Sequence, residues 1–390
     1  MTRRVRIAVV GVGRWGYNLA RSLSRLDSCE LVALCDSSLE RLTEVGRELG
    51  VAMTTEHFDD VLDHGIDAVV IATPPESHAR LARLAVNAGK HVFVEKPLAT
   101  SLAEGLELEQ AARAADRLVM AGHLLRFHGG VSAVRRLIAG GELGRVELMT
   151  SQRLGWRAAD RCGPWWSLAP HDLSVLRGCL AGEPLRVAAA AALEPPTSWN
   201  PMRAILGSGP ASQRPARSPA RVAALCEFPA GVTTIIDVGL LDDSKVRRVV
   251  AVGRRAMVRF EDGEQGGVWT KPTPRHMTWP TLPEGDGIFT IEEADRILGS
   301  LDETVTKGEP WVLVESNWPE PLALEMQQFV AACGNPRLAQ IEMEDALATL
   351  RALEAGSRSM RDGGRSVRVQ PRPKTLDHLS DEAPSRPSQL

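Results

Sequence analysis

Two residues of this chain, Lys96 and His171, carry side chains suited to proton transfer and charge stabilisation at a carbon–oxygen bond. Lys96 belongs to the triplet Glu95-Lys96-Pro97, which directly follows the predicted strand His91–Val94 with its three apolar residues. A strand that only needed to end could do so with a neutral turn residue. A carboxylate, an ammonium and a proline that restricts the lysine backbone instead predict a ligand site, and the lysine–proline bond is a candidate for the cis form.

The chemistry that these two side chains fit is the oxidation of a secondary alcohol, in which a proton is removed while hydride leaves. The imidazole of His171 titrates near neutral pH and suits the proton transfer, and the ammonium of Lys96 would stabilise the developing alkoxide. His171 follows Pro170 at a predicted helix start, where the helix dipole would favour the neutral base form. A helix-capping role is the structural alternative for His171. Asp172 would either orient the ring or add charge to the first helical turn.

The segment Gly11-Val-Gly13-Arg-Trp-Gly16 follows a predicted strand and opens a predicted helix. In that context Gly11 permits a tight turn, Gly13 lets the backbone approach a pyrophosphate, and Gly16 lets the helix pack on the strand. The free N–H groups at the helix start would face the diphosphate. The glycine pattern taken alone is weak, and a plain tight turn is its alternative.

Asp36 ends the next predicted strand, 20 residues past Gly16. Its carboxylate can accept hydrogen bonds from a ribose diol and would repel a 2′-phosphate, so we predict NAD as the cofactor. Ser37 and Ser38 could help to hold a phosphate, which leaves NADP as the alternative. His78 starts a predicted helix, and a histidine there is more often a capping or packing residue than a catalyst. The predicted cofactor-binding residues are Gly11, Gly13, Arg14, Trp15, Gly16, Asp36, Ser37, Thr73, Pro74, Pro75, His78, Glu95 and Lys96.

Substrate contacts are predicted from charged side chains in the middle of the chain, because arginine pairs well with diphosphate or carboxylate. A solvated surface position is the alternative for each of them. Trp156, Trp165 and Trp166 would stack on a sugar or uracil, or simply pack. The predicted substrate-binding residues are Lys96, Arg126, Arg153, Arg157, Asp160, His171 and Asp172.

Residues 1–122 alternate short apolar runs with amphipathic stretches, which predicts a parallel sheet covered by helices on both faces. Right-handed crossovers then favour a doubly wound Rossmann domain of the α/β class. The predicted strands are Val5–Val10, Leu31–Cys35, Ala68–Ala72, His91–Val94 and Leu118–Ala121, and the predicted helices are Gly16–Leu26, Leu39–Leu49, Glu76–Ala88 and Leu102–Ala115.

Residues 123–369 carry longer alternating runs, which predict a C-terminal α+β domain on an open, mainly antiparallel sheet. Pro195–Pro219 is predicted to be a surface excursion and residues 370–390 a disordered tail. The predicted strands are Val146–Leu154, Leu185–Leu193, Ala220–Phe228, Val232–Leu240, Val246–Val252 and Ala256–Phe260. The predicted helices are Val131–Ala139, Pro170–Leu180, Pro321–Cys333 and Met343–Asp362.

The composition is that of a soluble globular protein, with 44% hydrophobic residues and a formal net charge of −3, and argues against nucleic-acid or membrane partners. The six cysteines form no CxxC pair and no zinc-ligand spacing, so we expect reduced thiols and no metal. The basic N-terminus imitates a signal peptide, but its apolar run is short and broken by Gly11 and Gly13. A cytoplasmic location is the expectation.

Together these motifs resemble the glucose–fructose oxidoreductase / inositol dehydrogenase (Gfo/Idh/MocA) family over residues 1 to about 369. The resemblance implies a Rossmann domain, a C-terminal domain with an open antiparallel sheet, and a homo-oligomer, either a dimer or a tetramer. The matching motifs are Gly11-x-Gly13-x-x-Gly16, Thr73-Pro74-Pro75 with His78, Gly89-Lys-His-Val followed by Glu95-Lys96-Pro97-Leu98-Ala99, Gly122-His-Leu-Leu-Arg126-Phe, and Glu320-Pro-Leu-x-x-Glu325-Met-x-x-Phe329.

The family usually supplies a catalytic histidine in an Asp-x-x-x-His arrangement, to which His171 corresponds, with Ser167 in place of the aspartate. The run Trp166–Asp172, with Gly155-x-Arg157-x-x-Asp160 ahead of it, is similar to dehydrogenases acting at C3 of UDP-N-acetylglucosamine or its uronic acid. In that subgroup lysine and histidine suffice. The expected function is therefore NAD-dependent oxidation of a carbohydrate ring hydroxyl, with two alternatives: NADPH-dependent keto-sugar reduction in deoxysugar biosynthesis, or a non-catalytic sensor of NAD(H).

Overall fold

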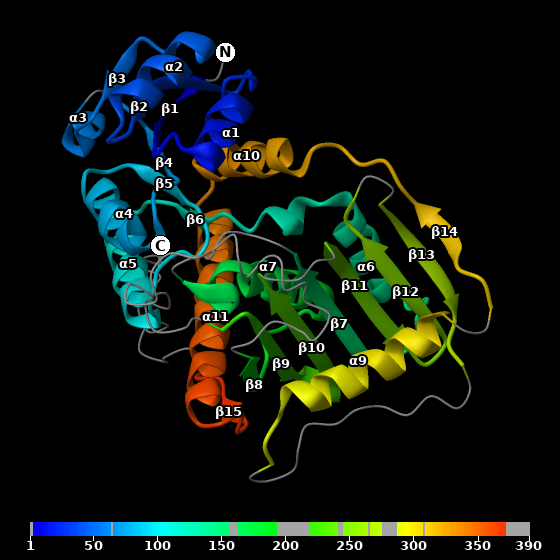
Figure 1. The fold of residues 1–390 in the computed structure, drawn as a ribbon. Helices are drawn as coiled ribbons and strands as arrows, with labels where there is room; N and C mark the ends of the chain where they lie inside the picture. The colour runs from blue at the N-terminus through cyan, green and yellow to red at the C-terminus, as the bar shows by residue number, and fades with distance from the viewer. Residues whose placement is uncertain are drawn as a thin grey trace, which may run out of the picture.

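The computed structural model describes residues 3–63, 65–155, 162–192, 219–240, 245–263, 266–274, 287–306 and 309–371. Two sheets form two lobes, and the long helix α11 (Pro336–Arg361), orange to red in Figure 1, runs along the boundary between them. Residues 195–218 of the predicted excursion and almost all of the predicted tail lie outside the described residues. Within the described part of the chain, no helix is long and apolar enough to cross a membrane.

The N-terminal lobe is a six-stranded parallel sheet in the order β3-β2-β1-β4-β5-β6. The chain builds outward from β1 on one side, then crosses over to build outward on the other, which is the predicted doubly wound arrangement. Its strands are β1 (Val5–Val10), β2 (Cys29–Cys35), β3 (Met53–Thr55), β4 (Ala68–Ile71), β5 (His91–Val94) and β6 (Val119–Ala121). Its helices are α1 (Arg14–Leu23), α2 (Leu39–Leu49), α3 (Phe58–Asp63), α4 (His78–Asn87) and α5 (Leu102–Ala115).

The C-terminal lobe is a nine-stranded sheet in the order β14-β13-β12-β11-β7-β10-β9-β8-β15, antiparallel except for the parallel pair β7 and β10. This confirms the predicted open, mainly antiparallel sheet. Its strands are β7 (Val146–Leu154), β8 (Arg186–Ala192), β9 (Arg221–Phe228), β10 (Val232–Gly239), β11 (Val246–Gly253), β12 (Ala256–Glu261), β13 (Gly267–Pro272), β14 (Val312–Glu315) and β15 (Val367–Arg368).

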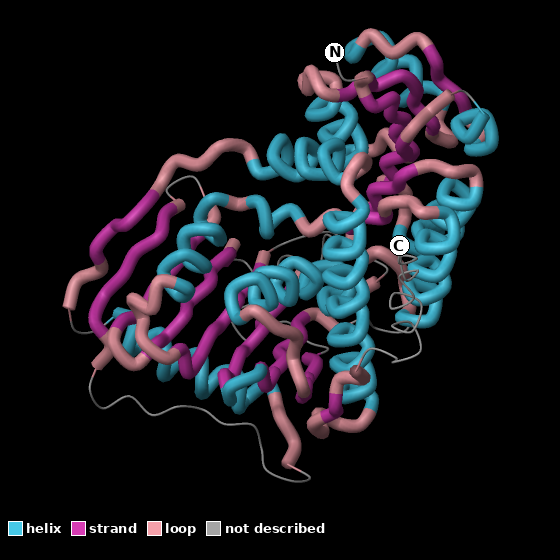
Figure 2. Tube along the Cα trace, turned by 180° about the vertical axis from the view of Figure 1, so that it is seen from behind, coloured by secondary structure: helices cyan, strands magenta, loops and turns pink. Residues whose placement is uncertain are grey.

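Helices cover both faces of the second sheet, as Figures 1 and 2 show from opposite sides. Helices α6 (Gly129–Ala139), α7 (Gly163–Leu180) and α11 bury one face in the main core. Helix α9 (Ile291–Thr306) packs on the other face through Ala294, Ile297 and Leu298. The sequence interpretation missed α9, although its buried residues have helical spacing.

Helix α10 (Pro321–Ala332) returns to the Rossmann lobe. Its residues Met326, Phe329 and Val330 share a core cluster with Ile7 and Phe93 of the parallel sheet. The N-terminal lobe therefore completes one side of its core with a helix from the far end of the chain. That helix lies behind the Glu95-Lys96 turn.

Helix α7 starts at Gly163, seven residues before the predicted start at Pro170. The prediction was wrong because tertiary packing supports the added turns: Trp165 is buried and its Nε1 donates to Leu353 O at 2.8 Å. Gly356 of α11 leaves the space, since a Cβ there would lie 2.3 Å from the Trp165 ring. Pro170 consequently sits inside the helix, where it has no N–H to donate.

Candidate active site

The glycine turn between β1 and α1 has the shape that a dinucleotide requires. Gly11 has φ +83°, and a Cβ there would lie 2.8 Å from the backbone of Ala72 and Thr73. A Cβ at Gly16 would lie 1.7 Å from Gly11 O, whereas one at Gly13 would meet no described atom within 4 Å. Gly13 is also the N-cap of α1, with no side chain capping it. Open space therefore faces uncapped N–H groups, which fits a bound diphosphate.

We predict that alanine at Gly13 and at Gly16 has opposite effects. Gly16→Ala should destabilise the fold by about 2 kcal/mol or more through its clash with Gly11 O. Gly13 has φ −61°, which alanine tolerates, so Gly13→Ala should keep the parent melting temperature. It should nevertheless raise the Kd for NAD about tenfold, equivalent to about 1.4 kcal/mol. Thermal unfolding and fluorescence titration check both expectations, and equal losses of melting temperature would contradict them.

Asp36 lies against the glycine turn. Its Oδ2 accepts a hydrogen bond from Val12 N at 2.7 Å, and its Oδ1 accepts one from Ser38 N at 2.9 Å. Ser37 is exposed at the same turn. The sequence interpretation missed Arg41, whose Nη2 donates to Val12 O at 3.1 Å. A guanidinium thus stands beside the carboxylate expected at the ribose, five residues after it in the chain.

Lys96 extends from the carboxyl edge of the Rossmann sheet to the second lobe. The Lys96–Pro97 bond is cis, and Lys96 Nζ donates to Ser167 O of α7 at 3.0 Å. Pro170 has no N–H to donate to the carbonyl of Trp166, the residue before Ser167. His171, partly buried, lies one helical turn after Ser167. The contact therefore brings the lysine to the segment of α7 that carries the imidazole.

The dipole argument for His171 was wrong, because the residue lies well inside α7 and not at its start. Ser167 cannot replace the aspartate found in many members of the family. It is 6% exposed, and its Oγ donates to Gly163 O at 2.7 Å within the helix. The predicted catalytic pair at this turn is therefore Lys96 and His171, without an acidic third member.

Glu95 is buried behind the lysine. It accepts hydrogen bonds from Trp15 Nε1 and, through Oε2, from Lys96 N at 3.1 Å. Burial raises the pKa of the Glu95 carboxyl, while Lys96 and Trp15 act in the opposite direction. Trp15 and the neighbouring Arg14 are exposed at the start of α1. The glycine turn and the Lys96 turn are thus tied together through one carboxylate.

His78 joins the two loops expected to contact the cofactor. Its Nδ1 lies 2.8 Å from Pro97 O and its Nε2 lies 2.8 Å from Thr73 O. The side chain is 1% exposed, so a contribution to cofactor binding would act through the loops. Pro74 and Pro75 continue the Thr73 loop toward α4 and remain predicted contacts. The ring holds the Thr73 and Pro97 turns in register.

Arg153 and Asp172, both predicted to bind substrate, pair with each other. Asp172 is fully buried, accepts from Ser151 Oγ at 2.6 Å, and lies 3.3 Å from both Arg153 Nε and Nη2. Burial of this carboxylate excludes direct contact with a substrate in this structure. The pair links β7 to α7, the helix that carries His171, and substrate contact by Arg153 stays a prediction.

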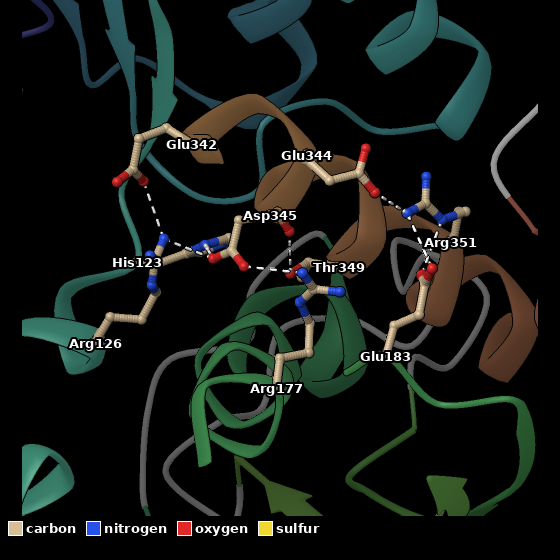
Figure 3. A network of polar contacts seen from close by, with 9 residues as sticks. All are labelled: His123, Arg126, Arg177, Glu183, Glu342, Glu344, Asp345, Thr349 and Arg351. Atoms are coloured by element: carbon tan, nitrogen blue, oxygen red, sulfur yellow. Dashed lines mark hydrogen bonds and ion pairs between the residues drawn. The ribbon is translucent and has the colours of Figure 1, made fainter. Parts of the chain in front are cut away.

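Arg126 is likewise committed to internal partners (Figure 3). Its Nη1 lies 2.9 Å from Glu342 Oε2 and 2.6 Å from Asp345 Oδ2, both in α11. Burial alone would lower the pKa of Arg126, but Asp345 and Glu342 raise it overall. Arg177 of α7 also pairs with Asp345, at 2.9 Å. In this structure Arg126 joins η2 (Leu124–Phe127) to α11, and its contact with a substrate stays a prediction.

The tryptophans near this site serve packing. Trp166 Nε1 donates to Ser357 Oγ of α11 at 3.0 Å, so Trp165 and Trp166 both donate a hydrogen bond to α11. Arg157, Asp160 and Trp156 lie outside the described residues. Within the described residues, no group of His, Cys, Asp or Glu side chains could hold a metal ion.

Comparison with known proteins identifies both lobes. A family model described as "Oxidoreductase family, NAD-binding Rossmann fold" matches residues 5–123, and the "GFO/IDH/MocA C-terminal domain" matches residues 131–259. The scyllo-inositol 2-dehydrogenase (NAD(+)) of Bacillus subtilis is 37% identical over 147 residues, covering 37% of this chain and 43% of that protein. Inositol 2-dehydrogenase 1 of Saccharopolyspora erythraea is 34% identical over 191 residues, covering 47% and 56%.

The chain thus spans about half the length of the curated relatives it matches. Over the whole chain, the aldose-aldose oxidoreductase of Caulobacter crescentus has the same fold, with a TM-score of 0.73, 20% identity, and coverage of 94% of this chain and 100% of that one. The two matched domains, in this order and on this architecture, confirm the resemblance noted in the motifs. The chain belongs to the Gfo/Idh/MocA family and carries that family's NAD-binding Rossmann domain.

Proposed function

We propose that this protein is an NAD-dependent dehydrogenase that oxidises a ring hydroxyl of a carbohydrate. The observation that carries the proposal is the contact of Lys96 Nζ with Ser167 O at 3.0 Å. It joins the turn at the carboxyl edge of the nucleotide-binding sheet to the helix turn of His171. Ligands bind at that edge in doubly wound sheets, and an ammonium and an imidazole there suit alcohol oxidation.

In this proposal the lysine and the histidine divide the work. NAD, when bound, supplies the hydride acceptor, and Gly11, Gly13, Asp36 and the uncapped start of α1 would hold it. The Lys96 ammonium exchanges its carbonyl partner for the substrate hydroxyl and stabilises negative charge on that oxygen. The His171 imidazole takes the hydroxyl proton. The family membership and the relative named scyllo-inositol 2-dehydrogenase (NAD(+)) support the reaction class.

For the substrate we propose C3 of a nucleotide-linked amino sugar. The support is Ser167, whose hydroxyl is used inside α7, because a lysine–histidine pair without an aspartate resembles the nucleotide-sugar subgroup. Free inositol is the competing substrate, since the named curated relatives act on inositols. For the cofactor, the Asp36 carboxylate favours NAD, whereas Arg41 beside it would favour a 2′-phosphate.

A substrate panel tests this proposal. We expect NADH to accumulate when the protein is mixed with NAD and UDP-N-acetylglucosamine or its uronic acid, with kcat/KM at least about tenfold above that for myo- or scyllo-inositol, a difference of about 1.4 kcal/mol. Higher kcat/KM for an inositol would overturn the nucleotide-sugar assignment and keep the dehydrogenase. Turnover only of keto-sugars with NADPH would reverse the direction. Binding of NADH without turnover of any sugar would favour the alternative, a non-catalytic sensor of NAD(H), over the dehydrogenase.

A further inference from the structure

A second buried carboxyl, Glu325 of α10, lies behind the Glu95-Lys96 turn. Glu325 is 0% exposed, and neither of its carboxyl oxygens has a hydrogen-bond partner among the described residues. A buried carboxylate without hydrogen bonds is costly, because it loses its hydration and gains nothing in return. Its state of ionisation therefore matters to the residues around it.

The contact between two aromatic rings shows where Glu325 lies relative to Glu95. The rings of Phe93 and Phe329 meet edge to face, with centroids 5.6 Å apart. Glu95 lies two residues after Phe93, on the same face of that strand and its extension, and Glu325 lies one turn before Phe329 on α10. The ring contact thus places both carboxyls at one interface. Gly122 packs closely against the Glu95 carboxyl group, since a Cβ there would lie 3.1 Å from Glu95 Oε1.

The charged groups facing Glu325 come from three elements. Glu95 faces it from the end of β5, Glu342 from α11, and Arg126 from η2. Arg126 already pairs with Glu342 and Asp345. Of the two buried carboxyl groups, Glu95 accepts hydrogen bonds from the N–H groups of Trp15 and Lys96. Glu325 has no hydrogen-bond donor among the described residues.

The difference in hydrogen-bond donors decides which of the two carboxyl groups ionises more readily. Burial, followed by repulsion from Glu95 and Glu342, raises the pKa of Glu325 well above its usual value, and Arg126 offsets this only in part. Of two like charges in one buried site, the one with hydrogen-bond donors is the one that persists. Burial raises the pKa of Glu95 as well, but its N–H donors favour negative charge on Glu95, next to the lysine, over negative charge on Glu325.

We propose that Glu325 is a positioning residue that holds a proton in the working protein, so that Glu95 alone carries the negative charge that anchors the Lys96 turn. Ionisation of Glu325 would add a second charge behind Glu95 and push that carboxylate from the Trp15 and Lys96 N–H groups. The catalytic part of this inference rests on the proposed dehydrogenase function. The protonation itself does not.

Infrared spectroscopy tests the proton directly. The parent protein at neutral pH should show a protonated-carboxyl C=O stretch that is lost in Glu325→Gln and kept in Glu109→Gln. Glu109 is a matched control, because it is 2% exposed but paired with Arg113 Nη2 at 3.0 Å. Absence of the band from the parent would overturn the inference. The measurement needs no substrate, so it stands apart from a failure of the proposed function.

The pH dependence of stability provides a second test. The folded-state pKa of Glu325 is raised, so its stabilising contribution is complete below the unfolded value of about 4.3 and is lost as pH rises toward the folded value. The parent melting temperature should therefore fall more steeply above about pH 5 than that of Glu325→Gln, whose amide mimics the neutral acid. Parallel curves would contradict the proposal.

The pH dependence of kcat then shows whether the proton on Glu325 positions the catalytic turn or serves only the stability of the fold. The parent should lose kcat as pH rises through the ionisation of Glu325, with KM for NAD little changed. Glu325→Gln should lack this alkaline fall. An infrared band combined with identical pH profiles would show that the proton is structural, and would overturn the positioning role.

Discussion

Lys96→Ala should lower kcat about 100- to 1,000-fold while the Kd for NAD stays within about twofold of the parent. The ammonium is the group expected to meet the developing alkoxide, and removing one such donor costs about 2.7–4 kcal/mol in the transition state. The cofactor contacts predicted around the glycine turn are untouched. Stopped-flow measurement of NADH formation, together with fluorescence titration of NAD, checks both parts.

Lys90→Ala is the matched control for this experiment. Lys90 directly precedes the same strand, β5, at its opposite end, and its Nζ donates to a backbone carbonyl, Ile66 O, at 3.0 Å. It should keep the parent kcat, because it lies at the amino edge of the sheet, away from the ligand edge. Equal rates for Lys96→Ala and the parent would remove the lysine from the mechanism.

His171→Ala should lower kcat about 100- to 10,000-fold and remove the acid limb of the kcat profile. The imidazole is the proposed acceptor of the hydroxyl proton, so without it the proton must pass to water. Rates measured across pH in buffers of increasing concentration should show partial rescue by added imidazole. An unchanged acid limb in the variant would assign that ionisation to another group.

His57→Ala serves as the control for His171, because His57 is exposed and follows β3, the edge strand at the opposite end of the strand order from β6. Its kcat should match the parent. A comparable loss in both histidine variants would indicate a general effect on folding, which thermal unfolding would reveal. The lysine and histidine experiments together test whether one turn of α7 and one turn after β5 form a single site.

Sequence determined the features that depend on local backbone requirements. Gly11 and Gly16 leave no room for a side chain, so their spacing reports a turn and a helix–strand contact wherever it occurs after an apolar run. Continuous apolar strands alternating with amphipathic helices predicted the doubly wound sheet, and alternating runs predicted most of the antiparallel one. The same local pattern placed Lys96 after β5 and made its bond to Pro97 a candidate for the cis form, which the structure has.

Tertiary structure decided how the charged side chains are used. A sequence marks Arg126, Arg153 and Asp172 as cations and anions, but cannot show whether their partners are ligands or other residues of the chain. In the fold, Arg126 meets α11 residues more than 200 positions away, and Arg153 meets Asp172. Residue types alone do not reveal these ion pairs, because they depend on which segments the fold brings together.

The same limit applies to α7 and α10. Local rules start a helix at Pro170, but packing of Trp165 on α11 extends α7 back to Gly163. Only the return of α10 to the Rossmann core brings Glu325 to the buried side of Glu95. Backbone propensity and periodicity act over a few residues, whereas burial and pairing depend on which distant segments meet. Helices, strands and turns can therefore be inferred from the sequence alone, whereas burial and ion pairing require the folded arrangement of the chain.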